Sequence, residues 1–324
     1  MSDIRCYNFI NEHFIKGKKK KVFSITDEYM DAYKENGKHR HTVSLYLMGL
    51  YFKDIFDISI KKGMSNHFCI CGWQDFEYSW YLTCLYHDVV SCVEKIGKEY
   101  FIKNDLFSSN LFIQYKDLLR FDKEIYEKYY DYRNKRDRVD HGIAAGIKLF
   151  DSLEKSFNDA TNGHRWSENA TYRHGNLYWR QEHLPHFAYI ADAVCCHNIW
   201  LVNANDKEKS DIYTDNGLGQ LVVHKEEDKL QLSEYPLQYL LCLLDTIELT
   251  KRFRNLDAKG ILENVYIQKQ ENSIKIGWTS LIKSQPEFFR WYSSIMTLSE
   301  WMGIIVGSCF HKDDLCCLEL KLPV

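Results

Sequence analysis

Proline and glycine are scarce in this chain, with 4 and 16 residues among 324. Their scarcity excludes a collagen-like or linker-rich protein, and no stretch has low complexity. No apolar run approaches the roughly 18 residues that a bilayer-spanning helix needs. The first residues, MSDIRCYNFINEHF, lack the charged and apolar regions of a signal peptide. We therefore expect a cytoplasmic protein with no membrane partner.

A strong excess of one charge is also missing. The formal net charge of −3 gives no general attraction to nucleic acid or to an anionic membrane. The one dense basic run, Lys18 to Lys21, is short and typical of a solvated face. Eleven cysteines are present, but none forms a CxxC pair and several lie in apolar helical runs. The cysteines are therefore predicted to be reduced core residues.

What the chain does have is helical periodicity over most of its length. Hydrophobic residues make up 45% of it, enough for a real core, and they recur mainly at helical spacing. Helices are expected over 41–56, from 78 to about 96, after 140, after Pro185 and after Pro236. The fold class is predicted to be mainly α. The helical domain is expected to span residues 1–258, with an irregular insert at about 161–187.

The pattern changes after about residue 259. ENVYIQKQENSIKIGW alternates around a polar turn and predicts a β-hairpin, residues 286–306 predict a helix, and LCCLELKL predicts a strand. Residues 259–324 are therefore predicted to form a small α+β module. Such a module could join two copies of the chain in a homo-oligomer, although capping the fold is its ordinary role.

Several predicted helices carry a histidine or an aspartate where the apolar pattern continues. These residues are His41, His87, Asp88, His141, His197 and Asp245. Taken singly, each histidine is typical of a satisfied core or capping residue, and Asp245 is typical of a carboxylate paired with arginine. Taken together they point to a metal, because carboxylates that share an apolar centre are costly unless a cation compensates them.

The number and type of these side chains predict two divalent ions. Imidazoles and carboxylates together suit Mn, Fe, Co, Ni or Zn. They are too many for one catalytic ion that must keep open positions. Adjacent residues on a helix point about 100° apart, so His87 can bind one ion while Asp88 reaches between the two. All of the residues named above are predicted metal ligands, and Asp88 is also assigned a catalytic role as the bridge.

In their order along the chain, these residues resemble the H…HD…D signature of the HD-domain superfamily of metal-dependent phosphohydrolases. The resemblance covers about residues 35–255 and is most specific in CLYHDVV and LLCLLDTIE. His141 and His197 are similar to the two extra histidines of members with binuclear or larger centres, which include cyclic-nucleotide and cyclic-dinucleotide phosphodiesterases. The resemblance implies an HD-domain helical bundle and phosphoester hydrolysis.

The sequence departs from the superfamily pattern in two places. Many relatives have glycine and lysine shortly after the doublet, whereas here Val89, Val90 and Ser91 follow it and the nearest lysine is Lys95. Lys95 is therefore the candidate for the phosphate contact of that lysine. No GYP signature is present, so cyclic di-GMP is not assigned as the substrate.

Further basic residues could bind the phosphates of a nucleotide substrate. The candidates are Arg138, Arg165, Arg173 and Arg180, and solvated arginines paired with nearby carboxylates would explain them equally well. His164, His174, His183 and His186 are candidate acids for the leaving oxygen, and His174, in YRHGN, is the favoured one. Asp140, Asp192 and Glu248 are candidate acceptors for the second N–H of the ligating histidines.

These observations predict a metal-dependent phosphohydrolase that cleaves a phosphoester bond of a nucleotide, of the phosphodiester type that the extra histidines favour. A deoxynucleoside triphosphate triphosphohydrolase is the alternative within the same class. From a different class, a degenerate HD domain could sense a nucleotide and signal through the C-terminal module.

Overall fold

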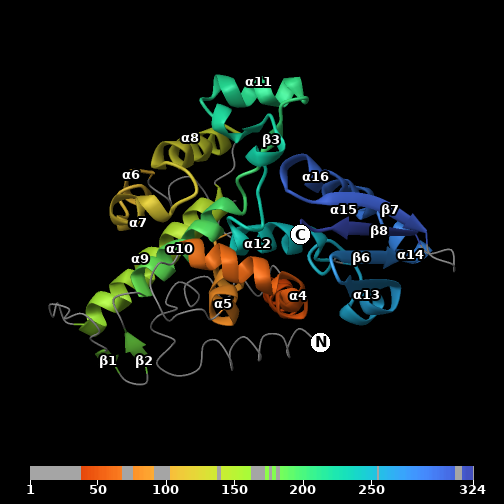
Figure 1. The fold of residues 1–324 in the computed structure, drawn as a ribbon, viewed down its shortest axis with the longest axis horizontal. Coiled ribbons are helices and arrows are strands. Elements are labelled where there is room, and N and C mark those ends of the chain that lie inside the picture. The colour runs from red at the N-terminus through yellow and green to blue at the C-terminus, as the bar shows by residue number, and fades with distance from the viewer. Residues whose placement is uncertain are drawn as a thin grey trace.

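The computed structural model describes residues 38–67, 76–90, 103–136, 140–161, 172–174, 177–179, 183–253, 255–310 and 316–323. This part of the chain is mainly helical, with a small antiparallel sheet near the C-terminus (Figure 1). Both features agree with the predicted fold class. Within the described residues, no helix combines the length and the apolar character that crossing a membrane requires.

A group of helices in the middle of the molecule forms the main core. They are α4 (Lys38–His67), α5 (Phe76–Tyr86), α9 (His141–Thr161), α10 (His183–Cys196) and α12 (Pro236–Ile247), and they pack against one another. Pro236 occupies the first turn of α12, as predicted. The predicted helix from 78 to about 96 differs, because α5 ends at Tyr86 and residues 87–90 form a turn.

Helices α9 and α10 approach each other closely because α9 carries glycine on the facing side. A Cβ atom added to Gly146 would lie 2.4 Å from both Ala191 O and Cys195 Sγ. Only a residue without a side chain fits there. This contact brings the first residue of α9, His141, to the end of α10, where His197 follows.

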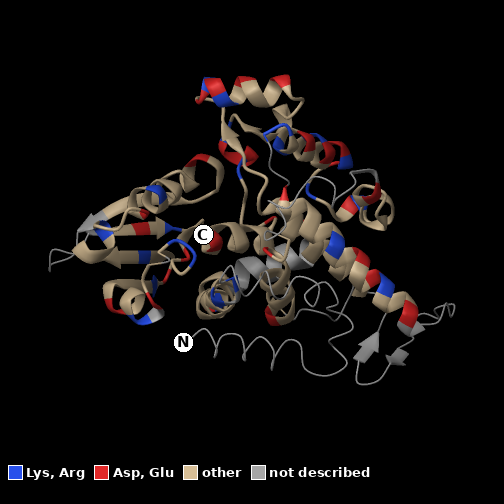
Figure 2. Cartoon of the chain, turned by 180° about the vertical axis from the view of Figure 1, so that it is seen from behind, with Lys and Arg blue, Asp and Glu red and all other residues tan. Residues whose placement is uncertain are grey.

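Shorter elements surround this core. They are α6 (Lys103–Leu106), α7 (Asn110–Gln114), η3 (Lys116–Leu118), α8 (Lys123–Asn134), β1 (Tyr172–His174), β2 (Leu177–Trp179), β3 (Val202–Asn203), α11 (Lys207–Asp215), η4 (Gly219–Leu221), β4 (Val222–Val223) and η5 (Glu226–Asp228). Strands β1 and β2 form a short antiparallel hairpin inside the stretch predicted to be irregular. Figure 2 shows charged residues along α8, α9 and α11, whereas α10 and α12 carry few.

The C-terminal part contains the antiparallel sheet, whose strand order is β5-β6-β8-β7. Its elements are α13 (Ala258–Asn264), β5 (Val265–Gln270), β6 (Ser273–Trp278), α14 (Ser280–Lys283), α15 (Phe288–Met296), α16 (Leu298–Trp301), β7 (Ile305–Phe310) and β8 (Cys316–Lys321). The predicted hairpin corresponds to β5 and β6. The single helix expected over 286–306 is instead two helices, which are followed by the start of β7.

The two parts share one continuous apolar core and are also joined by hydrogen bonds. Ile274 and Leu320 from the sheet belong to the same buried cluster as Leu244 of α12. Trp291 of α15 donates a hydrogen bond to Ile247 O, 3.4 Å away, at the end of α12. The division into domains at residue 258, and an oligomer formed through the C-terminal part, stay predictions.

The described cysteines follow the prediction in the helices but not in the sheet. Cys84, Cys195, Cys196 and Cys242 are buried and free, as expected for core residues in apolar helical runs. Cys317 on β8 is disulfide-bonded, which corrects the expectation that all cysteines are reduced. The expectation came from the cysteines in apolar helical runs. Such runs do not predict the state of a cysteine in a strand.

Candidate metal centre

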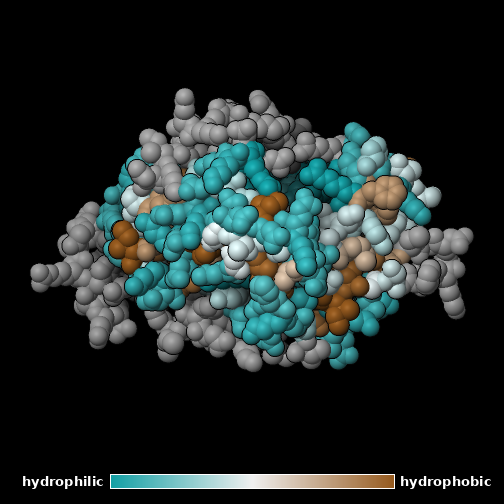
Figure 3. Space-filling view, turned by 90° about the horizontal axis from the view of Figure 1, so that it is seen from above, coloured by the Kyte–Doolittle hydropathy of each residue, from teal (hydrophilic) through white to brown (hydrophobic). Residues whose placement is uncertain are grey.

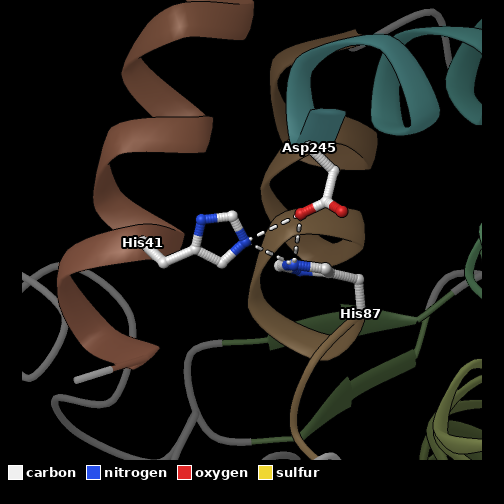
Figure 4. A group of neighbouring side chains, drawn as sticks. All are labelled: His41, His87 and Asp245. Atoms are coloured by element: carbon white, nitrogen blue, oxygen red, sulfur yellow. Dashed lines mark hydrogen bonds and ion pairs between the residues drawn. The ribbon is translucent and has the colours of Figure 1, made fainter. Parts of the chain in front are cut away.

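Three segments far apart in the sequence bring His41, His87 and Asp245 to one point (Figure 4). His41 lies on α4, His87 directly follows α5, and Asp245 lies in α12. His41 Nε2 is 2.9 Å from Asp245 Oδ1 and 3.1 Å from His87 Nε2, and His87 Nε2 is 3.9 Å from Asp245 Oδ1. These three ligand atoms could hold one metal ion.

A second group consists of Asp88, His141 and His197. One ligand atom from each lies within 4.8 Å of those of the other two. His141 Nε2 is 3.4 Å from Asp88 Oδ1, and the rings of His141 and His197 have centroids 5.3 Å apart. This group could hold a metal ion as well.

Asp88 joins the two groups. Its Oδ1 atom faces His141, while Oδ2 lies 3.5 Å from His87 Nε2 and 3.6 Å from His41 Nε2. One carboxylate therefore reaches both groups, as a bridging ligand must. The structure thus brings together all the side chains predicted as ligands, while metal binding itself stays a prediction.

The hydrogen bonds of the histidines leave Nε2 available for a metal. His87 Nδ1 is 2.8 Å from Cys84 O, and His197 Nδ1 is 2.6 Å from Val194 O. Because a carbonyl oxygen only accepts, each Nδ1 donates, and the neutral ring then carries its lone pair on Nε2. Backbone carbonyls thus fix the tautomer that a ligand requires.

The protonation of the buried histidines also suits metal binding. Burial lowers the pKa of His197 to about 3 and also lowers the pKa of His87, so both rings are neutral near pH 7. The pKa of His41 is instead raised, because hydrogen bonds to Asp245 and Glu248 outweigh burial and the nearby Lys251 ammonium. A metal at Nε2 of His41 would take the place of that extra proton.

Glu248 contacts the side of the His41 ring that faces away from His87 and Asp245. It is fully buried, and its Oε2 atom accepts a hydrogen bond from His41 Nδ1 at 2.8 Å. The backbone N–H groups of Thr250 and Lys251 also donate to its carboxylate, at 2.8 and 3.1 Å. Burial acts to raise the pKa of Glu248, but the bond from His41 and the bonds at Thr250 lower it to about 2. Glu248, one of the candidate acceptors, therefore contacts a predicted ligand directly.

Asp140 bonds to residues close in sequence to two of the predicted ligands. Its Oδ1 atom accepts from Ile143 N at 2.9 Å and caps the start of α9. Its Oδ2 atom accepts from Asn198 Nδ2, also at 2.9 Å. Asp140 directly precedes His141, and Asn198 directly follows His197. The bond between Asp140 and Asn198 therefore links the segments that carry these two histidines.

Asp192 does not serve the centre, which corrects its candidacy. The Tyr126 hydroxyl donates to Asp192 Oδ1, and Arg120 N donates to Oδ2 at 3.2 Å. Its position on α10 turns it toward α8, which carries Tyr126, and helical spacing alone did not distinguish this face.

Two lysines at the centre were missed by the sequence reasoning. Lys38 Nζ is 2.6 Å from Asp88 Oδ2, and Lys251 Nζ contacts Asp245 Oδ1. Burial acts to raise the pKa of each carboxyl, but Lys38 holds the pKa of Asp88, and Lys251 that of Asp245, well below the usual range. Lys38 lies three residues before His41 in a helix, and this spacing was the available signal.

Solvent reaches the centre on one side. The side chains of His41 and His87 are each 1% exposed, whereas Asp245 is 21% exposed and His141 is 16% exposed. The exposed side of the centre therefore lies beside Asp245 and His141, and Lys251 lies there too.

The predicted substrate-binding and acid residues remain untested. Lys95, Arg138, Arg165 and Arg180 lie outside the described residues. Arg173 and His174 belong to β1, but their predicted roles depend on side chains that also lie outside the described part. All of these roles stay predictions.

No protein-family model matches the chain, and neither a curated protein nor a solved structure matches it.

Proposed function

We propose that the protein is a metal-dependent phosphohydrolase of the HD-domain type that cleaves a phosphoester bond of a nucleotide. The observation that carries this proposal is the position of Asp88, whose two oxygens face His141 on one side and His41 and His87 on the other. A buried carboxylate shared by two histidine groups suits a pair of divalent ions.

The donor set decides which ions fit. His41, His87 and Asp245 would hold one ion, His141 and His197 would hold the other, and Asp88 would serve both. Nitrogen and carboxylate donors favour Mn, Fe, Co, Ni or Zn over calcium. When bound, such ions lower the pKa of a coordinated water and neutralise charge on phosphate oxygens.

Lys38 and Lys251 fill the role of the lysine that is absent after the His-Asp doublet. Their ammonium groups lie at the carboxylates of Asp88 and Asp245. A change of side-chain conformation would bring them to a phosphate bound at the centre. Ions at these carboxylates would compete with both ammonium groups, which would then turn toward the phosphate oxygens. The two lysines thereby bind and orient the substrate.

Metal analysis combined with an activity assay tests the proposal. The protein is stripped with a chelator, reloaded with Mn²⁺ and incubated with cyclic nucleotides, linear dinucleotides and deoxynucleoside triphosphates, and the products are resolved by chromatography. We expect monoester products from a phosphodiester. Release of inorganic triphosphate would instead identify the triphosphohydrolase, and tight binding without turnover would identify the sensor.

Matched variants separate the centre from general stability. His87→Ala and Asp88→Ala should lose bound metal and activity. Asp192→Asn changes a buried aspartate that is not a predicted ligand, and it should keep both. If His87→Ala and Asp88→Ala retain metal and full activity, the proposal is wrong.

A further inference from the structure

A second feature of the molecule has the size of a ligand site. A cavity of about 730 Å³ lies between α8, α11, α16 and the segment around β3. Small-molecule sites are typically about 300–1,000 Å³. None of the predicted metal ligands lines this cavity, so it is separate from the centre described above.

Aromatic rings form much of its wall. Trp200 and Trp301 lie with ring centroids 5.6 Å apart, and Tyr132 and Tyr213 with centroids 5.4 Å apart. Trp200 is 39% exposed, and its indole nitrogen donates to Asn198 Oδ1 at 3.3 Å, which holds the ring in place. A fixed and partly exposed indole offers a face on which a planar base can stack.

Two arginines border the same cavity. The guanidinium of Arg136 lies over the ring of Tyr132, 4.4 Å from its centroid. The Arg136 side chain is exposed. Arg133 Nε is buried and has no hydrogen-bond partner in the described part of the chain, although it forms an ion pair with Asp140 Oδ2, 3.6 Å away. Guanidinium groups with donors to spare suit a phosphate group.

Two exposed carboxylates complete the lining. Glu208 and Glu300 both border the cavity. They would repel a phosphate placed beside them, but they accept hydrogen bonds from hydroxyl groups. The cavity thus offers aromatic rings, cations and carboxylates, and a nucleoside phosphate has a base, a phosphate and sugar hydroxyls to match them.

We propose that this cavity binds a nucleoside phosphate as a second site, distinct from the metal centre. The base stacks on Trp200, the phosphate is bound by Arg133 and Arg136, and the sugar hydroxyls donate to Glu208 and Glu300. A protein partner fits less well. Figure 3 shows the face on which α11 lies as mostly hydrophilic, with hydrophobic residues in small separate patches, whereas protein interfaces use larger apolar areas.

The site is connected to the metal centre through two residues. Arg133 lies near Asp140 and Trp200 contacts Asn198, and Asp140 and Asn198 bond to each other. They are the sequence neighbours of His141 and His197. Occupation of the cavity should therefore change the affinity of the centre for metal, and by linkage metal should change the affinity for nucleotide.

Calorimetry on the full-length Asp88→Asn variant tests the site, because this change disables the centre without touching the cavity. AMP, GMP, CMP and UMP are titrated in the presence of chelator, with adenosine and inorganic phosphate as partial ligands. We expect at least one monophosphate to bind one per chain, and more tightly than adenosine or phosphate. Arg136→Ala should weaken it by about tenfold or more, and Trp200→Ala by at least about fivefold.

Lys135→Ala is the matched control, because Lys135 neighbours Arg136, is exposed and bonds to Asn216 Oδ1 at 3.2 Å outside the cavity lining. It should bind nucleotide as the parent does, and circular dichroism should report the same fold for all variants. The proposal is overturned if no monophosphate binds, or if Arg136→Ala binds as well as Lys135→Ala. These outcomes are independent of the hydrolytic activity, which the wild-type nucleotide panel measures separately.

Discussion

His41 and Glu248 lie 207 positions apart in the sequence, yet His41 Nδ1 and Glu248 Oε2 are 2.8 Å apart. This bond orients the imidazole so that Nε2 faces His87 and Asp245. The pairing of a histidine with a buried carboxylate behind it is typical of metal sites, where it raises the basicity of the ligand. Glu248 is therefore the residue through which the proposed centre can be weakened without changing a ligand.

Glu248→Gln should lower metal affinity by about 10–100-fold. The amide keeps the size of the side chain but loses the negative charge that favours donation from His41, and one of its positions can no longer accept from the backbone at Thr250 or Lys251. Competition with a chelator of known affinity measures the change. An affinity equal to that of the wild type would show that His41 is not a ligand held by Glu248.

Lys251→Ala should separate metal binding from substrate binding. Removing the ammonium that contacts Asp245 leaves that carboxylate free for a cation, so metal affinity should stay the same or rise. The phosphate loses a charged partner, so kcat/KM should fall by about tenfold or more. The measurement pairs metal titration with steady-state kinetics, and Lys259→Ala, at an exposed lysine paired with Glu263, is the control. Lower metal affinity in Lys251→Ala would contradict the proposed role.

The helical part of the fold and the residues of the centre could be predicted because both follow from local pattern. Apolar residues at helical spacing define a buried face, and a histidine or aspartate that continues such a face is visible without coordinates. His87 and His197 each directly follow a helix, and His141 is the first residue of one. The three side chains, which were expected to lie together, therefore meet where helices begin or end.

What could not be predicted depends on which way a side chain turns and on what another segment brings to it. Asp192 was a plausible partner of the ligands, but it faces Tyr126 on α8 instead. Lys251 lies after the end of α12, where the chain turns back and helical spacing no longer applies. The cavity beside α11 gathers residues from 129 to 301, and no local pattern joins them.

Asp192 should make stability depend on pH. Burial raises the pKa of this carboxyl to about 6, although hydrogen bonds from Tyr126 and Arg120 N act to lower it. In an unfolded chain the pKa of an aspartate is near 3.9. Between these values the folded protein keeps a proton that the unfolded chain releases, so this group's contribution to stability falls as pH rises through the window.

Asp192→Asn should remove this dependence. Its free energy of unfolding, relative to wild type, should rise by about 2 kcal/mol between pH 4 and pH 7.5. Urea denaturation of both proteins at the two pH values gives the difference, and bound metal should be unchanged. A difference that stays constant with pH would mean that the carboxyl is already ionised at pH 4 in the folded protein.

Gly146→Ala should destabilise the protein and weaken the second ligand group. The new Cβ would lie 2.4 Å from Ala191 O, a backbone atom of α10, so α9 must move away, at a cost of about 1–3 kcal/mol that exceeds the gain in helix propensity of alanine. Because α9 begins at His141 and α10 leads to His197, the shift separates these side chains and should lower metal occupancy. Gly219→Ala is the control, since a Cβ there meets nothing within 4 Å. Urea denaturation and metal analysis check both variants, and equal stability for the two would show that the α9–α10 contact is not tight.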